Sequence, residues 1–446
     1  MMEKDSKKAY FAYSLPAFVL AFAGLPLYVL APDFYATEMG VSLGLLGGML
    51  LALRAFDALQ DPVIGYISDR FAHKRRFFFL VAFVVFAIGM LVLYIPAKSF
   101  AAYAFGIGIV LSTTAFSIIS INLNAIGSLM TQNTHAKTDI TAWREGLGLG
   151  GVLLASILPF VLGHFLVPRA AFAAYALIFA LCVFIAALFF LPWLANRPTL
   201  QGLDTQRQKA TAPVDFSFLK DVNLRFFFLA YAVSVLASAL PAVLVIFFIR
   251  DVLQAESMTG PFLLLYFLSA IAFIPVWKAL SARIGKVQGW VTAIILAVGA
   301  FVGAGFLSAG DAVLYAVICM LSGAALGAEL ILPPSILSDL IDERAAADTT
   351  SMQFSVLAFL MKAALAVAAG ISFTLLEHSG FRAGTANSDV ALCMLAMLYA
   401  FIPCGLKLLS AGMLWAWAKW LQKGKMENEK NNRIYSNGGH YDIGGV

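Results

Sequence analysis

Twelve long apolar segments, separated by shorter polar ones, constrain this chain more than any other feature of its sequence. A helix that crosses a lipid bilayer needs about 20 mostly apolar residues. The segments that meet this requirement are residues 10–31, 43–69, 77–97, 100–128, 145–167, 169–193, 224–249, 260–282, 288–308, 312–340, 353–376 and 389–421. We therefore predict an all-α membrane protein with twelve transmembrane helices.

The composition excludes the soluble alternatives. Of the 446 residues, 61% are hydrophobic and 12% are charged, whereas soluble domains are about 25% charged. A soluble enzyme, a nucleic-acid-binding protein and an outer-membrane barrel with alternating strands all need more polar sequence than this. The sequence also shows no nucleophile–base arrangement, metal-ligand spacing or nucleotide-binding loop. We expect neither an enzymatic activity nor a cofactor, and no nucleic-acid partner.

The longest polar stretch between apolar segments divides the predicted helices into six and six. We predict an N-terminal six-helix bundle at residues 1–193, a cytoplasmic central linker at 194–222 and a C-terminal six-helix bundle at 223–422. The tail at 423–446 is polar and rich in Asn and Gly, which is typical of a disordered segment.

The basic residues predict the orientation in the membrane. The loops on one side carry only Lys98, Arg169, Arg250 and Arg382, and the other side is rich in Lys and Arg. Because basic loops remain in the cytoplasm, we expect both termini on the cytoplasmic side of a bacterial-type inner membrane. We expect a monomer surrounded by lipid.

The second apolar segment carries Arg54, Asp57 and Asp61, with Gln60 between the two acids. A charge at the bilayer centre costs about 2.5–3.5 kcal/mol, so such residues face a polar interior. Asp57 and Asp61 are four residues apart and share one helix face. Their oxygens are suited to Na⁺ or Li⁺; alternatively, repulsion between the two carboxylates favours a bound proton. A structural Arg54–Asp57 pair is the third interpretation.

A short internal repeat supports the two-bundle prediction. Pro62 and Arg70 correspond, at one common offset, to Pro275 and Arg283 in the second half. At the same offset the two acids are replaced by Ala270 and Ile274. The predicted cation site therefore belongs to the N-terminal half alone.

The loop after the second segment has a recognisable pattern, formed by Gly65, Asp69, Arg70, Lys74 and Arg75. It resembles the signature loop of the major facilitator superfamily. That resemblance implies two six-helix bundles around a central cavity, with this loop acting as a conformational latch.

A narrower resemblance rests on three matches. The run from Arg54 to Gly65 is similar to that of the glycoside–pentoside–hexuronide:cation symporters. The segment Leu332-Pro333 followed by Asp339 and Asp342, and the intramembrane Lys362, resemble the same family. The matches extend over nearly the whole chain. They imply a secondary active transporter that moves a small solute, foremost a sugar or glycoside, together with Na⁺ or H⁺.

The resemblance also implies roles for individual residues. The cation ligands would be Asp57, Asp61, Gln60 and Ser117, supported by Arg54. Arg144 would be a substrate or gating residue, and Lys362 would neutralise or communicate with the acidic site. The polar residues of the predicted cavity, rather than the resemblance, add Ser120, Asn122, Asn124 and Glu329 to Arg144 and Lys362 as candidate substrate contacts. The latch would comprise Gly65, Asp69, Arg70, Lys74, Arg75, Asp339 and Asp342.

Departures from the family pattern leave the substrate open. The two sugar-binding acids of the family are Ala21 and Ser120 here, and its stacking Trp is Asn124. An amphiphilic or lysolipid-like anion is the alternative, because Arg144 and Lys362 are retained. A membrane sensor or scaffold without transport would be expected to lose the acid pair or the latch, and both are intact.

Two charges in the second half have several interpretations. Glu329 lies deep in apolar sequence. It is interpreted as a substrate acceptor, a partner of Lys362, a second proton site or half of a buried structural pair. Lys407, in the twelfth segment, either lines the cavity or extends toward the membrane surface.

Overall fold

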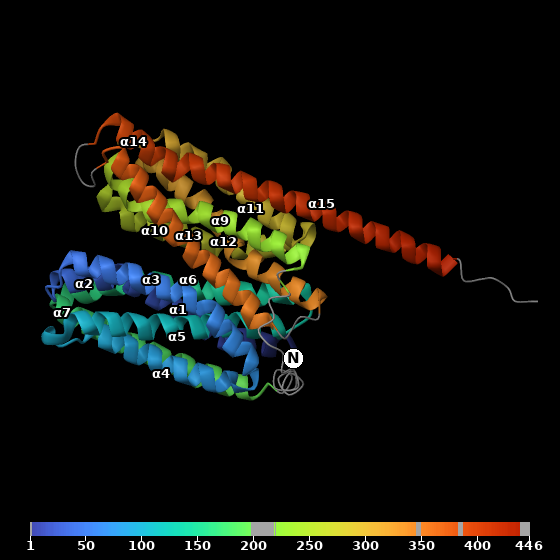
Figure 1. Ribbon diagram of the computed structural model, residues 1–446, viewed down its shortest axis with the longest axis horizontal. Helices are drawn as coiled ribbons and strands as arrows, with labels where there is room; N and C mark the ends of the chain where they lie inside the picture. Colours follow the sequence, from blue (N-terminus) through green and yellow to red (C-terminus); the bar gives the residue numbers. More distant parts are fainter. Residues whose placement is uncertain (1, 198–217, 219, 345–348, 382–386, 438–446) are drawn as a thin grey trace, which may run out of the picture.

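The computed structural model describes residues 2–197, 218, 220–344, 349–381 and 387–437. Figure 1 shows two groups of long helices lying side by side, one from each half of the chain. Apolar runs of this length become helices because a helix satisfies its own backbone hydrogen bonds, which lipid cannot do.

The N-terminal bundle contains six long helical segments. The first is interrupted by a π-helical turn, and short 3₁₀ turns precede the third and fourth. The bounds are α1 (Met2–Leu25), η1 (Pro26–Leu30), α2 (Ala31–Thr37), α3 (Leu43–Arg70), η2 (Ala72–Lys74), α4 (Arg75–Tyr94), η3 (Lys98–Phe100), α5 (Ala101–Leu129), α6 (Thr134–Phe165) and α7 (Pro168–Ala195).

The C-terminal bundle repeats this plan with six more segments. Its first and last segments also contain π-helical turns. The bounds are α9 (Val222–Phe247), η5 (Phe248–Val252), η6 (Glu256–Met258), α10 (Thr259–Ile284), α11 (Lys286–Phe301), η7 (Val302–Phe306), α12 (Ala312–Glu343), α13 (Thr350–His378), α14 (Asp389–Ala396), η9 (Met397–Phe401) and α15 (Ile402–Asn437).

The described helices follow the predicted segments in order. Ten of them are long and apolar enough to cross a membrane. The segments beginning with α1 and α3 complete the twelve, so the all-α prediction is confirmed.

The observed helices extend beyond the predicted segments, most of all at the start of the fifth and the end of the twelfth. The fifth long helix begins at Thr134, because the Asn133 side chain accepts hydrogen bonds from the first-turn amides of His135 and Ala136. The twelfth continues to Asn437, where disorder was expected. This stretch contains good helix formers, including Glu429 and Arg433 at the favourable four-residue spacing.

Parts of the predicted linker and tail fall outside the described residues. Residues 198–217 and 219 of the linker, and 438–446 of the tail, are not part of the described chain.

Close packing of helices positions the interior of each bundle. At Gly323 of α12, a Cβ atom would lie 2.2 Å from the carbonyl oxygen of Tyr266 in α10. Only glycine allows this approach, which is typical of small residues at membrane helix contacts. The apolar core around Phe86 and Phe179 lies entirely within the N-terminal bundle.

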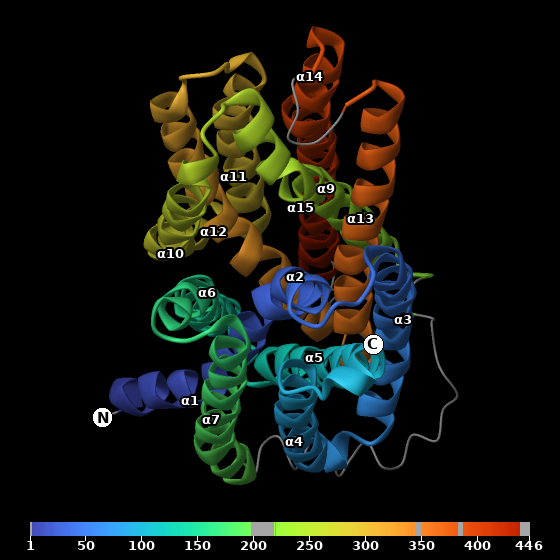
Figure 2. The ribbon, with the colours of Figure 1, turned by 90° about the vertical axis from the view of Figure 1, so that its left-hand side faces the viewer.

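A second core joins the two bundles. Ala142 and Leu149 of α6 belong to the same buried cluster as Trp277 and Ile336 of the C-terminal bundle. We call the end of the molecule that carries Arg70, Lys74 and Arg75 the basic end. The opposite end, which carries α2 and α14, is the far end and faces the viewer in Figure 2.

Candidate functional site

A buried ammonium group lies among acidic and hydroxyl oxygens at the middle of the molecule. Lys362 of α13 places its Nζ 2.8 Å from Asp57 Oδ1 and 2.9 Å from Asp61 Oδ1. The same atom lies 2.9 Å from Ser117 Oγ of α5 and 3.1 Å from the Asp57 carbonyl oxygen. We call these four oxygens the oxygen cage. It joins α3 and α5 of one bundle to α13 of the other.

The oxygen cage is shielded from solvent. The Asp61 side chain is 0% exposed and that of Lys362 is 18% exposed. Asp61 Oδ2 is buried and has no hydrogen-bond partner among the described residues. Two carboxylates therefore face a single ammonium, and one carboxylate oxygen remains unsatisfied.

Gln60 supports the cage, but its side-chain oxygen is not one of the four cage oxygens. Its Nε2 donates to Asp57 Oδ1 at 2.9 Å, and its Oε1 accepts from Thr114 Oγ1 at 2.8 Å. A carboxylate can only accept, which fixes the amide in this orientation. Arg54, one turn before Asp57 on α3, has an exposed side chain.

Three of the residues assigned to substrate are connected in the N-terminal bundle. Arg144 of α6 is 5% exposed and donates to Asn124 Oδ1 of α5. Its Nε and Nη2 also donate to Glu145 Oε1, at 2.9 and 2.6 Å. Asn124 in turn donates to the carbonyl oxygen of Ser120. Sequence analysis missed Glu145, which directly neutralises Arg144.

Asn122 lies elsewhere. Its side chain is fully buried and donates to Ser68 Oγ of α3 at 2.8 Å and to the carbonyl oxygen of Ile118 at 2.9 Å. The structure thus places Asn122 in the α3–α5 contact and apart from the Arg144 group.

Glu329 pairs with Lys407 in the C-terminal bundle. Lys407 Nζ lies 2.6 Å from both Glu329 carboxylate oxygens and donates to Ser234 Oγ at 2.9 Å. Ser238 Oγ donates to Glu329 Oε2 at 3.2 Å. Of the four interpretations, a partnership with Lys362 is not observed, because Lys362 lies in the oxygen cage.

The predicted latch joins α3 to α13 at the basic end. Asp69 accepts hydrogen bonds from the backbone amides of Ser351 and Met352, at 2.9 and 2.8 Å. These amides belong to the first turn of α13, so Asp69 caps a helix of the other bundle. Arg75 reaches Asp69 Oδ1 at 3.4 Å and Ser351 Oγ at 3.0 Å.

The other predicted latch residues divide into two groups. At Gly65 a Cβ atom would lie 2.5 Å from Ser355 Oγ of α13, so the helices are close because this residue is glycine. Arg70 and Lys74 lie instead over aromatic rings of their own bundle, Tyr66 and Phe71.

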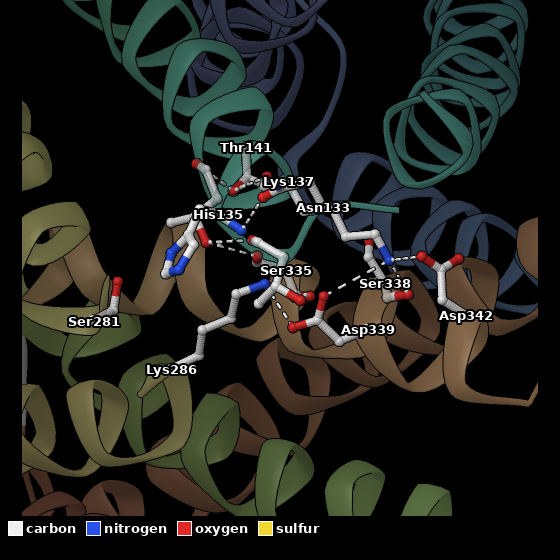
Figure 3. Close-up of polar contacts among 12 residues, drawn as sticks. Asn133, His135, Lys137, Thr141, Ser281, Lys286, Ser335, Ser338, Asp339 and Asp342 are labelled. Carbon is white, nitrogen blue, oxygen red and sulfur yellow. Dashed lines mark hydrogen bonds and ion pairs between the residues drawn. The ribbon is translucent and has the colours of Figure 1, made fainter. Parts of the chain in front are cut away.

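A second seam joins α6 to α12 (Figure 3). Lys137 is 1% exposed, and its Nζ lies 2.5 Å from Asp342 Oδ2 and 3.7 Å from Asp339 Oδ1. Lys286 of α11 lies 2.6 Å from Asp339 Oδ2. Thr138 and Ser335 hydroxyls are 3.1 Å apart across the same seam.

Sequence analysis identified Asp339 and Asp342 but missed Lys137 and Lys286. Both lysines lie in the first turn of a helix at the basic end. In the sequence such residues are indistinguishable from ordinary loop charges of the same sign. The signal that was available is the acidic pair itself, which requires basic partners when buried.

Comparisons with known proteins agree with this architecture. A family model described as MFS/sugar transport protein matches residues 10–417. The inner membrane symporter YicJ of Escherichia coli (strain K12) is 27% identical over 146 residues, which are 31% of this chain and 31% of YicJ. The uncharacterized symporter YnaJ of Bacillus subtilis (strain 168) is 31% identical over 155 residues, 32% of each chain. The matched segments thus span about a third of these relatives.

Among solved structures, a bacterial homologue of the iron transporter ferroportin, in an outward-facing state with soaked iron, has the same fold. Its TM-score is 0.68 at 15% sequence identity, and the match covers 92% of this chain and 98% of that one.

Proposed function

The chain belongs to the MFS/sugar transport protein family, and from this premise we propose that it is a secondary active symporter that couples a small solute to a cation. The observation that carries the proposal is the oxygen cage. It places two buried carboxylates, a hydroxyl and a carbonyl oxygen around one positive charge near the midpoints of α3, α5 and α13.

The cage is suited to cation coupling because the positive charge that it now holds, the Lys362 ammonium, belongs to the protein and can be exchanged for an external cation. Asp61 Oδ2 has no hydrogen-bond partner among the described residues, so the cage has an oxygen ready for a cation or a proton. Na⁺ or Li⁺ coordinated by Asp57, Asp61 and Ser117, or a proton bound to one of the two carboxylates, displaces the Lys362 ammonium. Since Lys362 belongs to the opposite bundle, displacement releases a tie between the two halves.

The ion remains a choice between Na⁺ and H⁺. Gln60 uses its amide nitrogen to hold Asp57 and its oxygen to bind Thr114. It leaves the cation with the oxygens of Asp57, Asp61 and Ser117 alone. A proton needs only one of these carboxylates, whereas an alkali cation needs several oxygens and completes its shell with water.

Alternating access follows from the two seams at the basic end. The α3–α13 and α6–α12 contacts close that end of the pathway between the bundles. If the basic end lies in the cytoplasm of an inner membrane, as the positive-inside rule favours, this conformation is closed to the cytoplasm. Both chain termini then lie on the cytoplasmic side.

A sugar or glycoside is the substrate class that the family description favours. The alternative of an amphiphilic anion rested on the retention of Arg144 and Lys362 and on the loss of the sugar-binding acids. Arg144 pairs with Glu145, and Lys362 with Asp57 and Asp61. Neither cation is left to attract an anionic substrate.

The proposal is tested by uptake into right-side-out membrane vesicles. Radiolabelled melibiose, lactose and methyl β-D-xyloside are supplied under an imposed Na⁺ gradient, an imposed pH gradient, or neither. We expect accumulation of at least one sugar above equilibrium under one gradient, and its loss in Asp61→Asn. Equal accumulation by Asp61→Asn, or none under either gradient, would contradict the proposal.

A further inference from the structure

A second buried charge pair, outside the oxygen cage, lies near the middle of the C-terminal bundle. The side chains of Lys407 and Glu329 are 9% and 14% exposed. Their partners, Ser234 and Ser238, stand one turn apart on α9. The pair takes no part in either seam of the basic end.

Packing alone does not account for this pair. Apolar residues of similar volume replace a buried ion pair at no cost, and often with a gain in stability. Within a membrane the pair is more costly still, so charged residues there usually mark a functional pathway. The question is which of the two side chains faces that pathway.

Helix packing orients Glu329 away from α10. At Gly323 and Gly327, α12 contacts the backbone of α10 so closely that no side chain fits between them. Glu329 lies on the other side of α12, toward Ser234 and Lys407.

Tyr231 connects this group to the other bundle. It lies on α9 one turn before Ser234, and it belongs to the same buried apolar cluster as Ala328 of α12 and Leu149 of α6. Leu149 stands one turn after Glu145 on α6. The Glu329 side of the C-terminal bundle therefore borders the helix that carries Arg144.

The hydrogen-bond inventory separates the two members of the pair. An ammonium has three donors, and Lys407 uses them on both Glu329 oxygens and on Ser234. A carboxylate has about four acceptor positions. Lys407 and Ser238 occupy three, which leaves Glu329 Oε1 with capacity for another donor.

We infer that Glu329 is a specificity-determining residue that accepts a hydrogen bond from an O–H or N–H group of the substrate, and that Lys407 is its positioning residue. Lys407 neutralises the carboxylate and holds it from behind, while Glu329 faces the pathway. The inference rests on the proposed function and assigns its C-terminal substrate contact.

Thiol accessibility tests the placement of Glu329 without a known substrate. The background has the four native cysteines, Cys182, Cys319, Cys393 and Cys404, replaced by alanine. Glu329→Cys is combined with Lys407→Met, so that no unpaired lysine remains. A membrane-impermeant methanethiosulfonate is added from the far end, with Ser410→Cys, whose side chain is fully buried on α15, as the matched control.

We expect the thiol introduced by Glu329→Cys to react and that of Ser410→Cys to remain unmodified. If both stay unmodified while the double variant is folded by thermal unfolding, Glu329 does not face the pathway and the inference is wrong. This result is independent of cation coupling, so it separates failure of the inference from failure of the proposed function.

The positioning role of Lys407 is tested by the split between KM and maximal rate. With a sugar that wild-type vesicles accumulate, Lys407→Met should raise KM about tenfold or more, because a misplaced acceptor loses a charged hydrogen bond. Lys407→Arg should restore most of the affinity. A KM unchanged in Lys407→Met, or a loss confined to the amount of folded protein, would assign Lys407 a structural role only.

Discussion

At the scale of single residues, Lys362 determines how the acidic site behaves. Two carboxylates without a partner would be too costly inside a membrane bundle. The ammonium reduces this cost, yet it leaves Asp61 Oδ2 unsatisfied. We therefore expect the site to be stable without a cation and to gain stability from binding one.

Removal of the Lys362 charge tests this competition. In Lys362→Met, the carboxylates lose their internal counter-charge, so we expect lower thermal stability without Na⁺ and a cation affinity raised by about tenfold, or about 1.4 kcal/mol. Titration of the melting temperature with Na⁺ and with pH measures both. Lys98→Met, an exposed change at the far end, should alter neither. A Lys362→Met protein that depends on both Na⁺ and pH as the wild type does would refute the competition.

Sequence analysis could identify the members of the acidic site but not all its contacts. The four-residue spacing predicts that Asp57 and Asp61 share a face. In the structure both carboxylates and the Ser117 hydroxyl contact the same Lys362 ammonium. Which carboxylate each lysine meets depends on how distant helices pack against one another. Local sequence does not encode that packing, so the Lys407 partner of Glu329 on another helix of the same bundle was left open.

At the scale of helices, one carboxylate closes the α3–α13 contact. Asp69 satisfies two amides in the first turn of α13, which would otherwise be unpaired. The cap exists only when the two bundles meet at the basic end. Its free energy therefore stabilises that conformation selectively.

Asp69→Ala should open this contact. Loss of such a cap costs about 0.5–2 kcal/mol, so we expect faster hydrogen exchange at the amides of Ser351 and Met352. Mass spectrometry of peptides from the start of α13 measures the change. Arg70→Ala is the matched control, because Arg70 contacts Tyr66 and Phe71 of its own bundle. Equal exchange in all three proteins would show that the cap does not hold the helices together.

Gly65→Ala should also disturb the contact, for a steric reason. Its Cβ would lie 2.5 Å from Ser355 Oγ and 3.0 Å from Met352 Cα. We expect a reduced initial rate of coupled uptake, partly restored by Ser355→Gly because the Met352 backbone remains close. Gly163→Ala, which has open space around it, should transport normally. A normal rate in Gly65→Ala would show that the α3–α13 spacing is not limiting.

Predictions at the level of helices were reliable inside apolar runs and poor at their ends. Hydropathy defines the length that crosses the membrane, but a helix continues into water where a cap or charged pairs support it. The start of α6 at Thr134 is set by the Asn133 cap, and α15 continues to Asn437, beyond its apolar run.

At the scale of the whole molecule, the contacts between bundles are unevenly distributed. The α3–α13 and α6–α12 seams hold the basic end together, and the oxygen cage adds a tie at the centre. A transporter that alternates between two open states must break both seams in each cycle. The duplicated architecture was predictable from the sequence, whereas this choice of state was not, because it depends on contacts between distant residues.

A covalent bond across one seam should stop transport. Thr138 Oγ1 and Ser335 Oγ are 3.1 Å apart, so cysteines at these two positions would face each other, as a disulfide requires. In Thr138→Cys/Ser335→Cys, oxidation should cross-link the bundles and abolish uptake, and a reducing agent should restore it. Each single variant is the control. Full uptake by the oxidised, cross-linked protein would contradict the requirement that this seam opens.

The central claim is that a cation binds Asp57 and Asp61 in place of Lys362. The most direct measurement is thermal unfolding of the purified protein in Na⁺, Li⁺ and K⁺ at fixed ionic strength, and across pH. A ligand specific for the native state adds about 2.7 kcal/mol of stability at a hundredfold excess over Kd. We predict that Na⁺ or Li⁺ raises the stability or, if the proton is the coupling ion, that the stability depends on pH. Asp61→Asn should abolish this effect, and Asp389→Asn, an exposed change, should retain it. Identical unfolding of wild type and Asp61→Asn under every ion and pH would contradict the account.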